Sequence, residues 1–181
     1  MNFEMARFVT RFIGAALLRP ETYEDVEADS RALGQAIAVV LLSSIAAGVG
    51  SWGAAAGRPI VLAVIIVVAL LVWLAWAYLT YEIGARLMPT ARTQADVGQL
   101  LRTLGFASAP GVLRVFGIIP GATTPVFAVT ELWMLMAMVV AIRQALDYTS
   151  TARAAAVCAL SWALAVALGL VIGTLSVPAL S

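Results

Sequence analysis

The sequence has 181 residues, of which 62% are hydrophobic and 12% are charged, and its formal net charge is +1. A soluble domain carries about a quarter charged residues, so this composition predicts an integral membrane protein, and the low net charge offers nothing for nucleic-acid binding. The chain has no histidine and one cysteine, Cys158, which excludes an intrachain disulfide, a Cys/His zinc site and a histidine-activated nucleophile. We therefore expect no enzyme activity, no cofactor and no cleavable signal peptide.

Residues 3–18 predict an amphipathic helix lying in the membrane interface. At 100° per residue, polar and apolar side chains fall on opposite halves. The apolar half holds Met5, Phe8, Val9, Phe12, Ile13 and Ala16. The run is too short and too charged to cross a bilayer, so Arg7 and Arg11 on the polar half are expected to contact lipid headgroups. Alternatively, the helix packs on the protein's own membrane-facing surface.

Residues 20–30 (PETYEDVEADS) form an acidic connector with five carboxylates. Carboxylate clusters can bind calcium or magnesium, but this spacing matches no EF-hand loop. The other interpretations are a solvated, partly helical connector whose Asp29 or Ser30 caps the next helix, and a docking surface for a basic partner. With the first helix, the connector forms a peripheral region over 1–32, and residues 33–181 form the membrane bundle.

Five apolar segments approach the roughly 20 residues that span hydrocarbon. We place them at about 33–52, 60–81, 98–119, 125–142 and 154–177. Trp73 and Trp76 lie near the end of the second segment, where amphipathic rings favour the membrane interface. The fold class is therefore all-α, a bundle of five transmembrane helices preceded by an interfacial helix.

Local signals place two helix starts. Thr93 and Asp96 resemble a capping box at the start of the third helix, after a polar connector over 82–99. Thr149 or Ser150 can cap the fifth helix.

The arginines near the span ends predict the orientation. Five crossings would put only Arg58 on one side, against Arg7, Arg11, Arg19, Arg31, Arg86, Arg92, Arg143 and Arg153 on the other. This asymmetry predicts that the N-terminus is inside and the C-terminus outside.

Small residues predict close helix packing in lipid. Four-residue spacings occur in the third span, at Gly105 with Ala109 and at Ala107 with Gly111. In the fifth span the pattern comprises Ala165, Gly169 and Gly173. Pro110, which removes a backbone donor in mid-span, should kink the third helix near 106–109.

Charged residues inside predicted spans should pair, because an isolated charge in lipid is costly. Arg114 and Glu131 flank the short turn between the third and fourth spans at similar depth, which predicts an ion pair between them. Glu82 and Arg102 could pair near the other face, although Glu82 can also reach Arg86 one turn along.

Three segments resemble the bacterial branch of the Yip1-domain membrane proteins. They are RFIGAALLRPETYEDVEAD, LRTLGFASAPGVL and ELWMLMAMVVAIRQALDYT, and the second contains a Gly-aromatic…Pro element, Gly105-Phe106-x-x-x-Pro110. The resemblance covers nearly the whole chain and implies five spans with a cytoplasmic N-terminus. Eukaryotic relatives act in vesicle traffic, associate with one another and bind Rab-type GTPases, and they carry a long cytoplasmic N-terminal region without a counterpart in this sequence.

These features predict a non-enzymatic multi-pass protein of the bacterial inner membrane. We expect a scaffold or accessory subunit that binds other membrane proteins, itself or lipid. The alternative is a small-solute or ion transporter or channel that uses Arg114 and Glu131.

Overall fold

The computed structural model describes residues 3–52 and 59–176, without the side chains at 3, 59, 61, 62, 65 and 168–176. Within these residues every regular element is a helix. The peripheral elements are α1 (Phe3–Ala16) and α2 (Pro20–Ala28). The long helices are α3 (Ala32–Gly50), α4 (Pro59–Tyr81), α6 (Thr123–Ala145) and α7 (Thr151–Ser176). Between α4 and α6 lie the π-helix η1 (Glu82–Leu87), α5 (Val97–Ala107) and the 3₁₀-helix η2 (Ala109–Ile118).

Three helices of the described chain are long and apolar enough to cross a membrane. They are Ala32–Gly50, Ile66–Leu87 and Thr123–Ala145, and a shorter apolar stretch covers Thr151–Ala167. The second of them runs past Tyr81 because η1 continues α4. The connector expected from residue 82 therefore begins only after Leu87.

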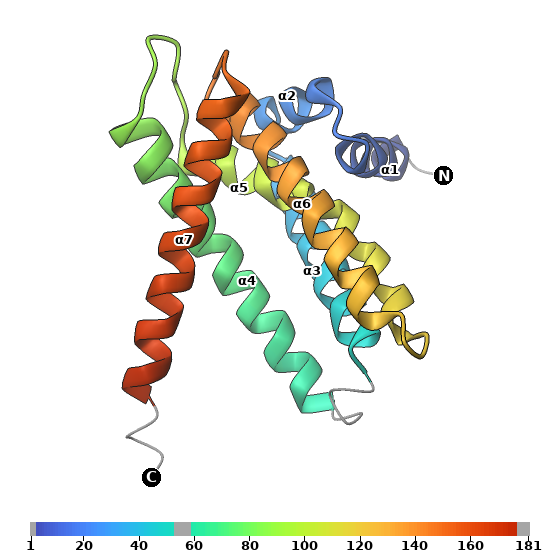
Figure 1. Cartoon of the computed structure of the whole chain (residues 1–181). Coiled ribbons are helices and arrows are strands. Elements are labelled where there is room, and N and C mark those ends of the chain that lie inside the picture. Colours follow the sequence, from blue (N-terminus) through green and yellow to red (C-terminus); the bar gives the residue numbers. More distant parts are fainter. Residues whose placement is uncertain (1–2, 53–58, 177–181) are drawn as a thin grey trace.

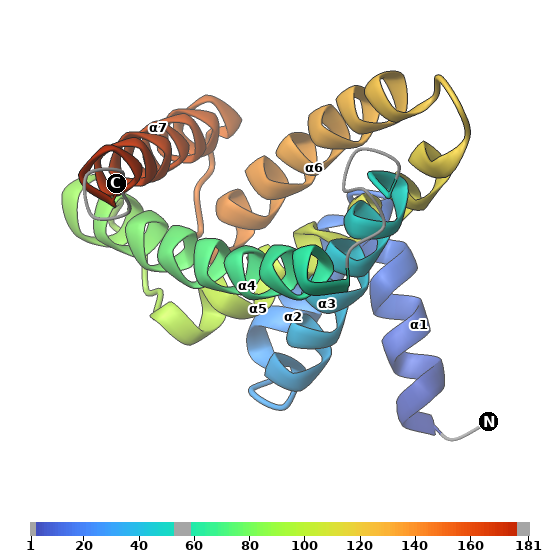
Figure 2. The same cartoon turned by 90° about the horizontal axis from the view of Figure 1, so that it is seen from below.

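The long helices form two arms that meet at one end (Figure 1). One arm contains α3, η2 and α6, and the other contains α7, which diverges from the first arm away from the α6–α7 turn (Figures 1 and 2). Helix α4 runs obliquely between the arms, from a start near the end of α3 to an end beside α7 (Figures 1 and 2). Helix α1 runs across the direction of the long helices, as the two views together show. This is the orientation expected of a helix lying along a membrane surface.

Polar contacts gather at the end where the arms meet. Gln144 at the end of α6 donates to Glu24 of α2 at 2.7 Å, and Thr93 in the loop before α5 donates to the carbonyl of Leu146 at 3.0 Å. The Tyr148 hydroxyl donates to the carbonyl of Gly84 at 2.8 Å. Helix α2, the 88–96 loop and the α6–α7 turn therefore share one end of the molecule.

Of the two helix starts expected from local signals, the cap of α7 is found, whereas the capping box of α5 lies three residues later than expected. Ser150 accepts a hydrogen bond from the Arg153 amide at 3.4 Å, just before α7. The capping box of α5, however, joins Asp96 and Gln99, not Thr93 and Asp96. The Thr93 hydroxyl instead donates to the Leu146 carbonyl. Thr93 therefore makes a tertiary contact in place of the helix cap that the local pattern predicted.

The third predicted span is not one continuous α-helix. Helix α5 ends at Ala107, inside the segment where Pro110 predicted a kink, and η2 continues as a 3₁₀-helix from Ala109. Proline cannot donate to the carbonyl four residues earlier, and its ring crowds that carbonyl. The Gly111 amide bonds to Ser108, three residues back, so the chain leaves the α-helical pattern here.

Small residues form a seam between α3 and the α5–η2 segment. A Cβ added to Gly105 would lie 2.7 Å from the Ala36 Cβ, and one added to Gly111 would lie 2.0 Å from the Ser43 Oγ. At the far end of the seam, a Cβ on Gly50 would lie 1.9 Å from the carbonyl oxygen of Arg114. These contacts bring the two backbones closer together than larger side chains would allow.

The spacing along the seam differs from the four-residue pattern expected for the third span. On α3 the contact residues are seven apart, about two α-helical turns, at Ala36, Ser43 and Gly50. The partner glycines, Gly105, Gly111 and Gly117, are six apart, which matches two turns of a 3₁₀-helix. Ala109 is buried, whereas Ala165 on α7 is half-buried. Gly169 and Gly173 fall in α7 beyond the side-chain positions that the structure describes.

Candidate functional site

A cavity of about 420 Å³ lies between the two arms of the bundle. Its walls come from α3, α4, α5, η2, α6 and α7. Three tryptophans line it, Trp73, Trp76 and Trp162, together with methionines of α6. A mostly apolar concavity of this size with a few polar groups is typical of a small-molecule site.

The tryptophans of α4 face the protein, contrary to their expected place in an interfacial belt. Trp73 is only 8% exposed, and its indole nitrogen has no hydrogen-bond partner among the described residues. Trp76 donates to the Ser161 hydroxyl of α7 at 3.0 Å. A buried indole N–H usually finds a partner, so the one on Trp73 is an unused donor beside the cavity.

The structure brings Arg114 and Glu131 together as an ion pair on the cavity wall. Arg114 Nη2 donates to Glu131 Oε1, and it also lies 3.1 Å from the Met134 sulfur. The Arg114 side chain is largely buried, whereas that of Glu131 is 56% exposed. The pair therefore has an inner cationic end and an outer anionic end.

The expected pairing of Glu82 with Arg102 is wrong. Glu82 accepts both of its hydrogen bonds from Arg86, one helical turn along, at 3.0 Å. Arg102 points to α2, where Nε donates to the Val26 carbonyl at 3.1 Å and Nη2 donates to the Glu27 carbonyl. A cation at the C-terminal end of a helix satisfies carbonyls that have no partner within the helix, and this is the role Arg102 takes.

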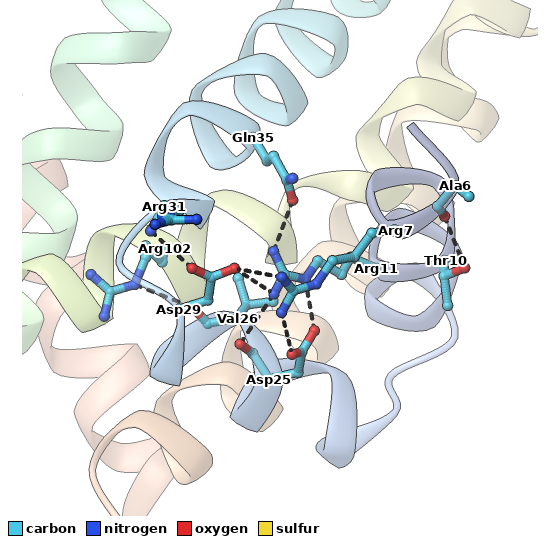
Figure 3. Close-up of polar contacts among 10 residues, drawn as sticks. All are labelled: Ala6, Arg7, Thr10, Arg11, Asp25, Val26, Asp29, Arg31, Gln35 and Arg102. Carbon is cyan, nitrogen blue, oxygen red and sulfur yellow. Dashed lines mark hydrogen bonds and ion pairs between the residues drawn. The ribbon is translucent and has the colours of Figure 1, made fainter. Parts of the chain in front are cut away.

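The N-terminal arginines bind the acidic connector (Figure 3). Arg11 is 3% exposed and contacts Asp25 at 2.7 Å, Asp29 at 2.9 Å and Gln35 of α3 at 3.1 Å. Arg7, at 37% exposure, lies 3.0 Å from Asp25 and 3.2 Å from Asp29. The expectation that Arg11 reaches lipid headgroups is therefore corrected, because its guanidinium is enclosed by carboxylates of this chain.

The connector itself is not a simple solvated linker. It folds as α2 and buries Tyr23 and Val26 against the core. Asp29 also accepts a hydrogen bond from the Arg31 amide at 3.0 Å, just before α3. The described residues contain no group of three or more His, Cys, Asp or Glu placed to hold a metal ion.

Electrostatics differ between the carboxylates of α2. Hydrogen bonds from Arg11 hold the pKa values of Asp25 and Asp29 below their usual range, although burial opposes this shift. Glu27 packs toward α5, where Gln99 donates to it at 3.2 Å. Burial, followed by the nearby charge of Asp147, raises the pKa of Glu27 to about 7.

The raised pKa of Glu27 makes stability depend on pH in a defined direction. The protonated form stabilises the fold fully below pH 4.5, the ordinary pKa of the group, and this contribution is lost as the pH rises through about 7. The substitution Glu27→Gln should therefore leave stability at pH 4.5 unchanged and raise it at pH 8, by about 1–2 kcal/mol after allowance for solvent screening. Thermal unfolding in detergent at both pH values measures this, and Glu21→Gln, at an exposed position of the same helix, is the control. Equal responses of the two variants at pH 8 would contradict the assignment.

The sequence analysis identified neither the cavity nor the cluster of Arg7, Arg11, Asp25 and Asp29. The cluster does, however, have a recognisable spacing in the sequence. Arg7 and Arg11 are four residues apart, and so are Asp25 and Asp29. Arg7 and Arg11 lie one turn apart on α1, and Asp25 of α2 lies four residues before Asp29, which follows the helix, so the two pairs have matching spacing.

Compared with known proteins, the chain matches no family model, no curated protein and no solved structure.

Proposed function

We propose that this chain is a non-enzymatic multi-pass membrane protein that acts as a scaffold or accessory subunit, binding other membrane proteins and organising lipid around them. It crosses the bilayer five times, with α3, α4–η1, α5–η2, α6 and α7 as the spans, the N-terminus in the cytoplasm and the C-terminus outside. The membrane is the bacterial inner membrane. The resemblance to the bacterial Yip1-domain proteins supports the same arrangement.

The observation that carries this proposal is the apolar outer surface of the long helices. Large apolar side chains are exposed along α3, α4, α6 and α7, and they include Leu42, Ile45, Val68, Leu71, Val129, Leu132, Leu160 and Leu164. In water such a continuous apolar surface would be unfavourable, whereas hydrocarbon solvates it. The polar contacts at the α2 end support an interface with water there.

The exposed face of α1 supports its place on the membrane surface. Phe8 and Phe12 pack against the core, while Met5, Val9 and Ile13, spaced four residues apart, are exposed. Because Arg11 is enclosed by α2, this apolar stripe rather than the arginine carries the contact with lipid. One face of α1 thus packs against the rest of the protein, and the opposite face contacts the membrane interface.

Helix α4 offers the clearest surface for another membrane helix. Val67, Leu71, Leu74 and Tyr78 are all exposed and follow a spacing of four, three and four residues. This spacing places them on one helix face, the pattern by which helices pack together. We therefore assign partner binding to this α4 face.

The test compares two bulky substitutions on equally exposed helices. Leu71→Trp changes the α4 face, and Leu132→Trp changes α6, with exposures of 59% and 62% in the parent protein. Each protein is purified from native membranes in mild detergent, and the mass of the complex is measured. A stoichiometric partner or second copy that Leu71→Trp loses and Leu132→Trp keeps supports the proposal. A protein that is monomeric and free of partners in several mild detergents contradicts it.

The second candidate is a small-solute or ion transporter, favoured by the position of the Arg114–Glu131 pair on the cavity wall. Charged residues within membrane segments often mark a solute pathway. Solute flux into liposomes that disappears in Glu131→Gln would support this candidate. Absence of flux together with a stoichiometric partner would favour the scaffold.

A further inference from the structure

We infer that the cavity between the arms binds the headgroup and the upper chain region of a zwitterionic phospholipid, with the phosphate on Arg114 and the ammonium on Glu131. The inference rests on the membrane location proposed above and names the lipid that the protein holds. It is argued from the unused hydrogen-bonding capacity of the ion pair, from the cavity walls and from the exposure of Glu131.

Arg114 has donors to spare. Its described hydrogen bonds leave from Nη2, and neither Nε nor Nη1 has a partner among the described residues. Of these two nitrogens Nε is fully buried, so Nη1 is the donor open to a ligand. A guanidinium has five N–H donors in a planar fork that suits phosphate oxygens. Because the group already lies at the cavity wall, a phosphate can bind without new burial of the cation.

Glu131 supplies the complementary charge. It accepts from Arg114 on Oε1, and more than half of its side chain is exposed. A carboxylate has further acceptor sites, which an ammonium group can use. The phosphate of a purely anionic lipid would bind Arg114, but the negative charge of this lipid would also be repelled by Glu131. An uncharged glycerolipid would form no charged contact with either residue. The neutral pair thus selects a ligand that carries both charges.

The remaining walls suit hydrocarbon and ester groups. Trp73, Met134 and Met138 line the cavity, and methionine adapts its shape to flexible apolar ligands. Trp73 lines the cavity with a side chain that is more than nine-tenths buried, and its indole N–H has no acceptor among the described residues. An ester carbonyl that packs against this ring would supply the missing acceptor. The volume of about 420 Å³ holds a headgroup and the start of a chain, so that the rest of the lipid stays in the bilayer.

The experiment measures lipid retention by native mass spectrometry of the full chain in detergent. Phosphatidylethanolamine and phosphatidylglycerol with identical chains are titrated separately. We expect phosphatidylethanolamine to bind at least about 5-fold more tightly, since one charge-assisted contact distinguishes the two lipids. In Glu131→Gln this preference should vanish or reverse. Equal affinities in the parent protein, or an unchanged preference in Glu131→Gln, would overturn the inference.

Two matched pairs locate the site. Ala69 lines the cavity and Ala75 faces outward on the same helix, so Ala69→Phe should abolish retention of phosphatidylethanolamine while Ala75→Phe keeps it. Trp73→Phe should weaken binding about 5- to 10-fold, because it removes one donor and keeps the ring, whereas Trp52→Phe should not. Retention in both Ala69→Phe and Trp73→Phe at parental affinity would overturn the inference. Membrane topology is measured independently, so a protein with the proposed crossings but no lipid preference would refute only this inference.

Discussion

Gly50→Ala should lower the free energy of unfolding in detergent by about 3 kcal/mol, the upper part of the range for overpacking. The added Cβ would lie 1.9 Å from the carbonyl oxygen of Arg114 and 3.1 Å from a ring carbon of Phe127. The first of these atoms belongs to the backbone of η2, so it cannot rotate away as a side chain does. Helix α3 and η2 must move apart along the seam. Thermal or denaturant unfolding followed by circular dichroism measures the loss.

The matched control is Gly34→Ala on the same helix. No atom lies within 4 Å of a Cβ added there, and alanine favours a helix over glycine by about 0.5–1 kcal/mol. We therefore expect Gly34→Ala to leave stability unchanged or to raise it slightly. Similar losses in the two variants would show that the seam is not the cause.

Arg11→Gln should lower the free energy of unfolding by about 2 kcal/mol and release α1 from α2. The change removes hydrogen bonds to both Asp25 and Asp29 from a guanidinium that is almost fully enclosed, and such charge-assisted bonds are worth about 1.5–3 kcal/mol. Limited trypsin cleavage after Arg7, which lies within α1, together with thermal unfolding, measures release and stability. Faster cleavage is expected in Arg11→Gln.

The control is Arg7→Gln, which removes the more exposed partner of the same carboxylates. An exposed pair contributes at most about 1 kcal/mol, so this variant should lose much less stability.

The pH dependence of stability gives a second check on the role of Arg11. Because the pKa values of Asp25 and Asp29 are lowered, their contribution is present above their ordinary pKa, near 4, and is lost as the pH falls through the lowered values. The stability gap between the parent and Arg11→Gln should therefore be constant from about pH 6 to 8 and shrink below about pH 4; a gap unchanged under acid conditions would contradict this account.

The apolar pattern predicted the long helices well because their composition leaves few alternatives. The first predicted span, 33–52, corresponds to α3 at Ala32–Gly50, and the fourth, 125–142, lies within α6 at Thr123–Ala145. Hydropathy alone could not distinguish an α-helix from the 3₁₀-helix at Ala109–Ile118. Pro110 marked the break, but the six-residue glycine spacing becomes informative only once the helix type is known.

Ion pairs were predictable only where a short turn fixed the geometry. Arg114 and Glu131 flank the η2–α6 turn, so similar distances from it place them together. Arg102 and Glu82 lie on segments joined by a longer loop, and the carbonyls at the end of α2 compete for the arginine. Trp73 was assigned to a lipid interface because a single helix does not reveal which face its neighbours will cover.

Membrane topology measured by cysteine labelling tests the central claim most directly. The single Cys158 permits a Cys158→Ser background, into which Thr149→Cys at the α6–α7 turn and Ala122→Cys just before α6 are introduced separately. In right-side-out vesicles, an impermeant maleimide should label Ala122→Cys, whereas Thr149→Cys should react only after the membrane is opened. Labelling of both positions from the same side would show that α6 does not cross the membrane, and it would contradict the five-span account.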